Sequence, residues 1–91
     1  MRKVIVPNTY DYDGEFRPEK NPEGSYTFSV GIFRWVTDGE KIRRGKVIYR
    51  VRGYSPHSKM VYRRASQLCE AFDKEPKDWK GPRQKSEWVK G

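Results

Sequence analysis

The clearest hydrophobic pattern along the chain lies between Tyr26 and Gly53, where β-branched and aromatic residues flank Asp38-Gly39. This dipeptide favours a two-residue type I′ turn between the strands of a β-hairpin. If Thr37 pairs with Glu40 across the turn, one side of the hairpin carries only apolar residues and glycine, as a core face should. The residues on that side are Tyr26, Phe28, Val30, Ile32, Gly45, Val47, Tyr49 and Val51. A bulge near Gly45 would break this register.

The other side of the predicted hairpin combines aromatic and β-branched residues with a row of cations. It contains Phe33, Trp35, Ile42, Arg44, Lys46, Ile48, Arg50 and Arg52. Arginine and lysine neutralise phosphates, and aromatic rings offer planes on which bases or sugars can rest. In the alternative interpretation, the aromatic and β-branched residues of this side are buried under the N-terminal segment or the C-terminal tail. The arginines then form an ordinary solvated face.

A helix over about residues 56–74 is expected to follow the hairpin. Ser55-Pro56 is a typical helix start, with serine as the N-cap and proline at the first helical position, where its missing N–H costs nothing. Apolar residues then recur at spacings of four, three and four residues, which predicts one stripe packed on the sheet. The stripe consists of Val61, Ala65, Leu68 and Phe72, and Pro76 ends the helix.

The remaining segments complete a small α+β domain. Val4–Val6, ended by Pro7, are expected to form an edge strand, and residues 8–24 a long loop rich in glycine, proline and acidic residues,. The predicted fold class is therefore a small antiparallel sheet of about three strands packed against one C-terminal helix. Residues 1–76 form the single domain and residues 77–91 a flexible basic tail, in which Trp79 is the residue expected to dock on the core,.

This layout is shared by several DNA-binding modules, among them plant AP2-type and integrase arm-binding domains, which place such a sheet in the major groove. The order of strand, strand and helix also resembles the latter part of a double-stranded RNA-binding domain. That family's first helix and its basic helix-start signature are absent from this chain. No residue motif carries either resemblance, so the sequence assigns no family.

Composition adds a strong basic imbalance to this picture. The 91 residues include 20 Lys and Arg against 12 Asp and Glu, a formal net charge of +8, and the pI is about 9.8. Residues 1–25 hold four basic and five acidic residues, whereas residues 26–91 hold the other 16 basic and seven acidic ones. The excess lies on the hairpin, helix and tail, which favours a polyanion as the partner.

Candidates for catalysis, metals or cofactors are few. The single histidine, His57, is expected at the surface, and the single cysteine, Cys69, as a small buried hydrophobe on or beside the apolar stripe,. Asp11, Asp13 and Glu15 resemble the start of a calcium loop, but the third acidic position and the distal glutamate are missing. Solvation of a loop is the favoured interpretation of this cluster, over pairing with basic residues of the sheet. We expect no enzyme, no metal site and no cofactor.

The compartment is also constrained by composition. A lone cysteine forms no internal disulfide, and no apolar stretch approaches the length of a membrane span,. Residues 1–6 contain basic residues but no apolar region of a signal peptide,. A cytoplasmic location with no membrane partner is therefore expected.

The leading hypothesis is a small basic nucleic-acid-binding protein, for DNA or RNA, whose sheet face and tail contact phosphates and bases. The candidate contact residues are Phe33, Trp35, Arg44, Lys46, Arg50, Arg52, Arg63, Arg64, Lys80, Arg83 and Lys85. The alternative is a small inhibitor or adaptor, such as a phage-encoded antagonist of a host defence system, that binds an acidic surface of a protein partner. A third hypothesis, a structural subunit of a ribonucleoprotein or virion, needs a tail that orders on assembly.

Overall fold

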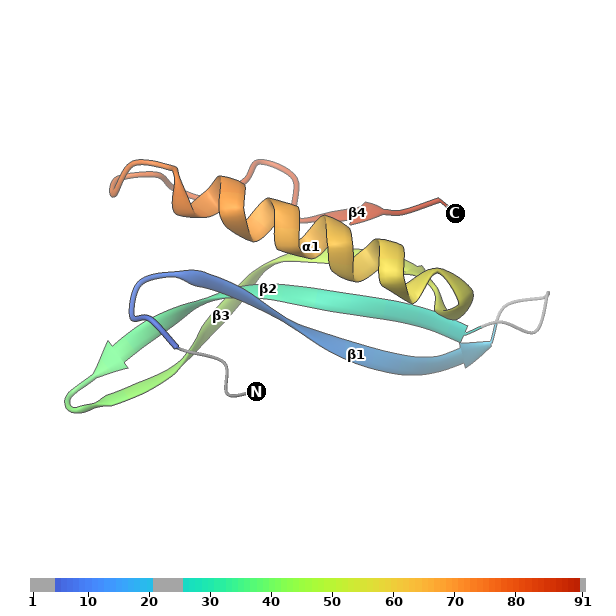
Figure 1. The fold of residues 1–91 in the computed structure, drawn as a ribbon, viewed down its shortest axis with the longest axis horizontal. Helices are drawn as coiled ribbons and strands as arrows, with labels where there is room; N and C mark the ends of the chain where they lie inside the picture. Colours follow the sequence, from blue (N-terminus) through green and yellow to red (C-terminus); the bar gives the residue numbers. More distant parts are fainter. Residues whose placement is uncertain (1–4, 21–25, 91) are drawn as a thin grey trace.

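The computed structural model describes residues 5–20 and 26–90, and in these one α-helix packs on a four-stranded sheet (Figure 1). The strands are β1 (Tyr10–Lys20), β2 (Tyr26–Asp38), β3 (Lys41–Tyr54) and β4 (Ser86–Trp88), and they lie in that order in the sheet. A 3-10 turn, η1 (Ser55–His57), leads from β3 into α1 (Ser58–Asp73). The first three strands pair antiparallel, whereas β4 pairs parallel to β3.

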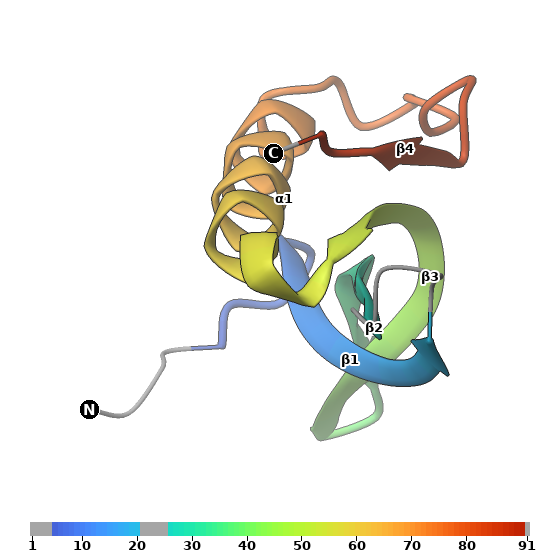
Figure 2. The same cartoon turned by 90° about the vertical axis from the view of Figure 1, so that its right-hand side faces the viewer.

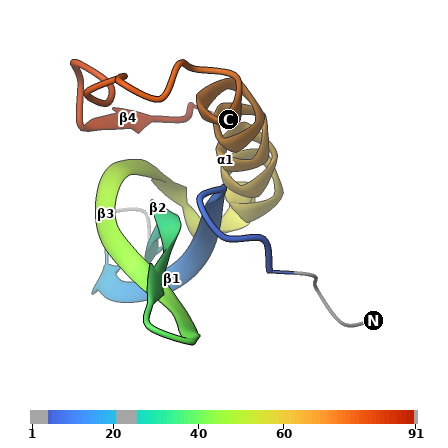
Figure 3. The same ribbon diagram turned by 90° about the vertical axis from the view of Figure 1, so that its left-hand side faces the viewer.

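The predicted α+β class is confirmed, with four strands in the described residues where the sequence predicts about three. The additional strand, β4, comes from the segment predicted as a tail. Figures 2 and 3 show the sheet curling from β1 to β4 around the side on which α1 lies. Because β4 runs parallel to β3, the sheet is mixed rather than purely antiparallel.

The N-terminal part of the prediction is wrong. Ile5 and Val6 are exposed and lie in no strand, while Val4 lies outside the described residues. The strand that pairs with β2 is β1, within the segment 8–24 predicted as a loop, of which residues 21–24 also lie outside the described residues. In β1, Tyr10 and Tyr12 pack against the core and alternate with two aspartates, which is the two-residue period of a strand,.

The hairpin of β2 and β3 is confirmed, but its turn differs from the predicted one. The sequence pairs Thr37 with Glu40, whereas the structure pairs Asp38 with Lys41. Gly39 is therefore the first of the two central residues, and its φ is 64°. A type I′ turn needs positive φ at both central residues, but in residues 5–20 and 26–90 Asn8 is the only non-glycine residue with positive φ, so Glu40 has none,. The turn is therefore of type II′, and the predicted type I′ turn is wrong.

Two register shifts follow along the hairpin, one on each side of Phe33. Phe33 pairs with Val47 and Trp35 pairs with Arg44, so β3 contains more residues than β2 over this stretch. The bulge anticipated near Gly45 is thus present, and it changes which side chains face the core. Val47 was expected in the core and is 38% exposed instead.

The core lies between the sheet and one face of α1. Its fully packed members are Phe28, Val30, Ile32, Tyr49, Val51, Val61, Ala65, Cys69 and Phe72. The helical stripe is therefore confirmed, with Leu68 partly buried beside it and Cys69 buried as expected. Ile48, predicted on the opposite side of the sheet, also packs partly against this core because of the bulge.

The start of the helix differs in detail from the prediction. Pro56 lies in η1 as expected of an early helical position, but α1 itself begins at Ser58. Neither η1 nor α1 has a hydrogen bond from a capping side chain, so the expected N-cap role of Ser55 is wrong.

Trp79 docks on the core, as the sequence predicts. Its ring centroid lies 5.0 Å from that of Phe72 and 6.1 Å from that of Tyr10. The carboxylate of Asp73 accepts a hydrogen bond from the backbone N–H of Tyr10 at 2.8 Å. These contacts attach the end of α1 and the following segment to β1.

Gly53 of β3 lies close against Val61 of α1, which gives a test of this packing. A Cβ atom at this position would lie 2.7 Å from Cγ2 of Val61, a fully buried side chain. We expect Gly53→Ala to destabilise the fold by about 1–3 kcal/mol through overpacking. Val61→Ala removes the clashing methyl group and leaves a cavity, at a separate cost of similar size.

A double-mutant cycle in urea denaturation separates these effects. We expect the combined Gly53→Ala and Val61→Ala variant to lose less free energy of unfolding than the sum of the losses in the two single variants. Additive effects would show that the glycine is not required by this contact.

Candidate nucleic-acid interface

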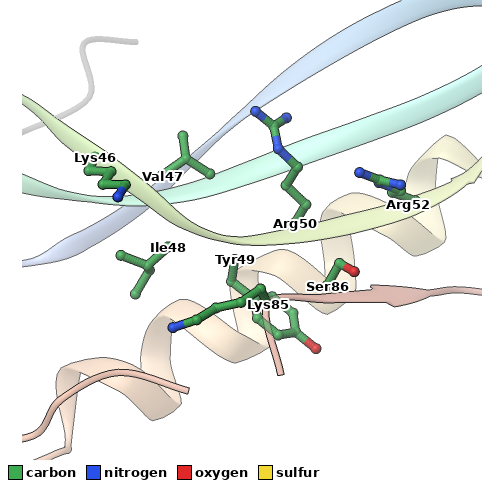
Figure 4. Close-up of a pocket in the computed structure, with 8 residues that line it drawn as sticks. All are labelled: Lys46, Val47, Ile48, Tyr49, Arg50, Arg52, Lys85 and Ser86. Atoms are coloured by element: carbon green, nitrogen blue, oxygen red, sulfur yellow. The ribbon is translucent and has the colours of Figure 1, made fainter. Parts of the chain in front are cut away.

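A groove of about 460 Å³ lies along β3 beside the start of β4 (Figure 4). Its lining residues are Lys46, Val47, Ile48, Tyr49, Arg50, Arg52, Lys85 and Ser86. Four of these eight residues are basic and none is acidic. The fold thus brings together four of the residues predicted from sequence, which come from the hairpin and from the C-terminal segment. We call Lys46, Arg50, Arg52 and Lys85 the groove cations.

The groove owes its position to the short length of β4, which pairs only with the three residues 50–52 of β3. The backbone N–H of Arg50 donates to the carbonyl of Lys85 at 2.9 Å, which holds Lys85 beside β3. At the other end of β4, the N–H of Val89 donates to the carbonyl of Arg52 at 2.7 Å. Figure 4 shows Arg50 and Tyr49 pointing to opposite sides of β3.

Three of the groove cations have no acidic partner among the described residues. In the described part of the chain, no carboxylate lies at ion-pair distance from Lys46, Arg52 or Lys85. All three side chains are exposed. Like charges held close together without counter-charges raise the local positive potential, which attracts anions into the groove.

The neighbouring part of the same sheet face is already engaged in internal contacts. Arg44 forms an ion pair with Asp13 of β1, and its guanidinium lies 5.1 Å from the ring centroid of Phe33. Phe33 is only 3% exposed. It therefore presents no open ring plane, contrary to the expectation from sequence, and Arg44 already has a counter-charge.

Trp35 is held by Asp11, the other aspartate of β1. Its indole N–H donates to the Oδ2 atom of Asp11 at 2.9 Å, and Oδ1 of the same carboxylate accepts from the backbone N–H of Tyr12 at 2.8 Å. Asp11 is only 8% exposed. Asp11 and Asp13 thus contact residues of the sheet, so the interpretation of this cluster as a solvated loop is wrong for these two residues, while the side chain of Glu15 lies outside the described part of the structure.

Arg64 of α1 is part of a network that joins the helix to β3 and β4. Its Nε donates to Glu87 of β4 at 2.9 Å, and the Tyr49 hydroxyl donates to the other carboxylate oxygen at 2.8 Å. Burial and the Glu87 contact raise the pKa of Tyr49 to about 12. Burial alone would raise the pKa of Glu87, but the hydrogen bonds from Arg64 and Tyr49 outweigh it and hold that pKa below its usual value.

The other predicted contact residues lie apart from the groove lining. Arg63 is exposed on α1, beside Met60 and Gln67 in a separate hollow. Lys80 and Arg83 are exposed in the connection from α1 to β4. Their positions leave them free to add charge near a bound polyanion, and no contact in the structure joins them to the groove cations.

One aromatic pair near the groove was missed by the sequence analysis. Trp88 of β4 is 42% exposed and packs edge-on against Tyr54, with the ring centroids 5.0 Å apart. Trp88 pairs with Arg52 across the two strands. The alternation of Glu87 and Val89 with Trp88 was the available signal, but three residues are too few to predict a strand.

Other sites for chemistry are sparse. Among the described residues, no three His, Cys, Asp or Glu side chains gather into a potential metal site. No helix formed by residues 5–20 or 26–90 is long and apolar enough to cross a membrane. The chain matches no family model, no curated protein and no solved structure. Function must therefore be argued from the groove itself.

The Glu87 network predicts a dependence of stability on pH. Because the pKa of Glu87 is lowered in the fold, its ionised form stabilises the protein above the usual glutamate pKa, about 4.3,. This contribution disappears as the pH falls from there through the lower folded pKa. We expect Glu87→Gln to lose about 1 kcal/mol at neutral pH and to flatten the dependence below about pH 4.5.

Urea denaturation at a series of pH values measures both effects. Glu70→Gln, at an exposed position of α1, is the matched control and should leave stability at neutral pH unchanged. An equally steep acid dependence in wild type and Glu87→Gln would contradict the assigned role of Glu87.

Proposed function

We propose that this protein binds nucleic acid, with the groove beside β3 and β4 as the site of phosphate contact. The observation that carries the proposal is the gathering of four cations around one groove whose lining contains no acidic residue. Three arginines elsewhere on the sheet and helix do have counter-charges, in the pairs of Arg43 with Asp38, Arg44 with Asp13 and Arg64 with Glu87.

The physical gain from binding is electrostatic. Each lysine or arginine that neutralises a phosphate releases condensed counterions from the nucleic acid, which favours association at low salt. Binding also relieves the mutual repulsion of Lys46, Arg52 and Lys85, which have no carboxylate partner in the described residues. The net charge of +8 steers any polyanion toward the protein,.

The groove also has an apolar component. Val47 and Ile48 line it together with the cations, and Val47 is 38% exposed. A sugar or the edge of a base can cover such surface while phosphates meet the charges. This combination supports contact along the nucleic-acid backbone, without indicating a preferred base sequence.

A double Lys46→Ala and Lys85→Ala variant tests the proposal. We expect wild-type protein to bind labelled DNA or RNA in fluorescence anisotropy, with affinity that falls steeply with salt. Removing two phosphate contacts should weaken binding and reduce the slope of log K against log salt by about 1.4 for a single strand or about 1.8 for a duplex.

The matched control removes equal charge from a surface outside the groove lining. Lys59 is exposed on α1 and Lys90 follows β4, and neither lines the groove. Substituting both by alanine should change the slope much less than the groove variant does. No binding by wild type at about 50 mM salt, where phosphate contacts are strongest, would sink the proposal and leave an acidic protein surface as the expected partner.

A further inference from the structure

Among the described residues, Trp88 is an exposed tryptophan, and its contacts within the protein do not fully explain why it lies at the surface. It is 42% exposed, and the contact that positions it is the edge-on packing against Tyr54 at an interplanar angle of 75°. By contrast, Trp35 is tied to Asp11 through its indole N–H, and Trp79 packs against the core. Exposing an indole ring to water is unfavourable, and aromatic residues placed this way commonly contact a partner.

The register of β3 and β4 places Trp88 next to residues that line the groove. Ser86 pairs with Arg50 and Trp88 pairs with Arg52, so the cation-bearing strand and the tryptophan-bearing strand are in register. Side chains two residues apart on a strand point to the same face and lie about 6.6 Å apart. Ser86 and Arg52 both line the groove, so Trp88 stands one step beyond its end on the same face.

We infer that the protein prefers single-stranded nucleic acid, with phosphates against the groove cations and one base stacked on Trp88. This inference rests on the proposed nucleic-acid function and adds the strand class to it. The faces of bases are hidden inside a duplex and accessible in a single strand, so an exposed aromatic ring beside a cationic groove favours unpaired bases, on which it stacks without having to unstack a duplex. Cations alone would suffice for the backbone of a duplex.

Substitutions of Trp88 test the base contact separately from the charges. Loss of stacking on one aromatic ring typically costs about 1–3 kcal/mol, so Trp88→Leu should weaken single-strand binding by about 5- to 140-fold. Trp88→Phe retains a flat ring and should bind closer to wild type. Because both variants keep the net charge, the salt dependence should remain that of wild type.

The same variants are titrated with a labelled single strand and with the matching duplex. We expect wild type to bind the single strand more tightly than the duplex. Trp88→Leu should remove most of that preference with little change in affinity for the duplex. Circular dichroism and thermal unfolding establish that the variants are folded. Met60→Ala, which also removes exposed apolar surface, is the control, since Met60 lies on α1 away from the groove lining.

Two results would overturn the inference. One is wild-type affinity of Trp88→Leu for the single strand. The other is equal binding of single strand and duplex by wild type. In both cases the proposed function stands, because nucleic acid still binds through the groove cations. If wild type binds no nucleic acid at all, the proposed function is contradicted as well. The titration of wild type alone distinguishes this outcome from the other two.

Discussion

The pairing of β2 with β3 determines the position of nearly every other element. Beyond the two register shifts, Val30 pairs with Val51 and Ile32 with Tyr49, and these four buried residues form the floor on which α1 packs. The shifts also turn Val47 out of the core and place it in the lining of the groove. Core and candidate site are therefore consequences of one hairpin geometry.

The charges on the sheet are divided between strands in a way that supports both folding and binding. Asp11 and Asp13 of β1 satisfy Trp35 and Arg44, which closes the part of the face nearest the hairpin. Glu87 holds Tyr49 and Arg64 beneath β4. The carboxylates in these contacts hold strands and helix together, and among the described residues Lys46, Arg52 and Lys85 lie outside those pairs. The uncompensated cations repel one another in the free protein, and a bound polyanion relieves that repulsion.

Local sequence signals predicted the parts of the fold that depend on short-range patterns. The helix stripe follows from its spacing, and the hairpin follows from two β-rich segments around Asp38-Gly39. β1 was missed because Gly14 and the aspartates look like loop residues, although the tyrosines of the strand alternate with period two. β4 was missed because three residues in parallel pairing across a long separation leave almost no local pattern,.

The positive charge of the candidate site could be predicted from the sequence, but the set of residues that come together there could not. The sequence placed Lys46, Arg50 and Arg52 on one strand, but only the return of the chain after α1 brings Lys85 beside them. Whether Arg44 and Arg64 have counter-charges depends on the registers of β1 and β4, which cannot be read from composition. Trp88 became a candidate only once its pairing with Arg52 was known.

The central claim is that the surface formed by β3 and β4 is where nucleic acid binds. The most direct measurement is a two-dimensional NMR titration of isotope-labelled protein with a short DNA single strand at low salt. The account predicts that amide shifts concentrate in residues 46–52 and 85–88 and that the indole N–H of Trp88 moves with them. Shifts confined to the exposed side of α1 or to β1, or no shifts at all, would contradict it.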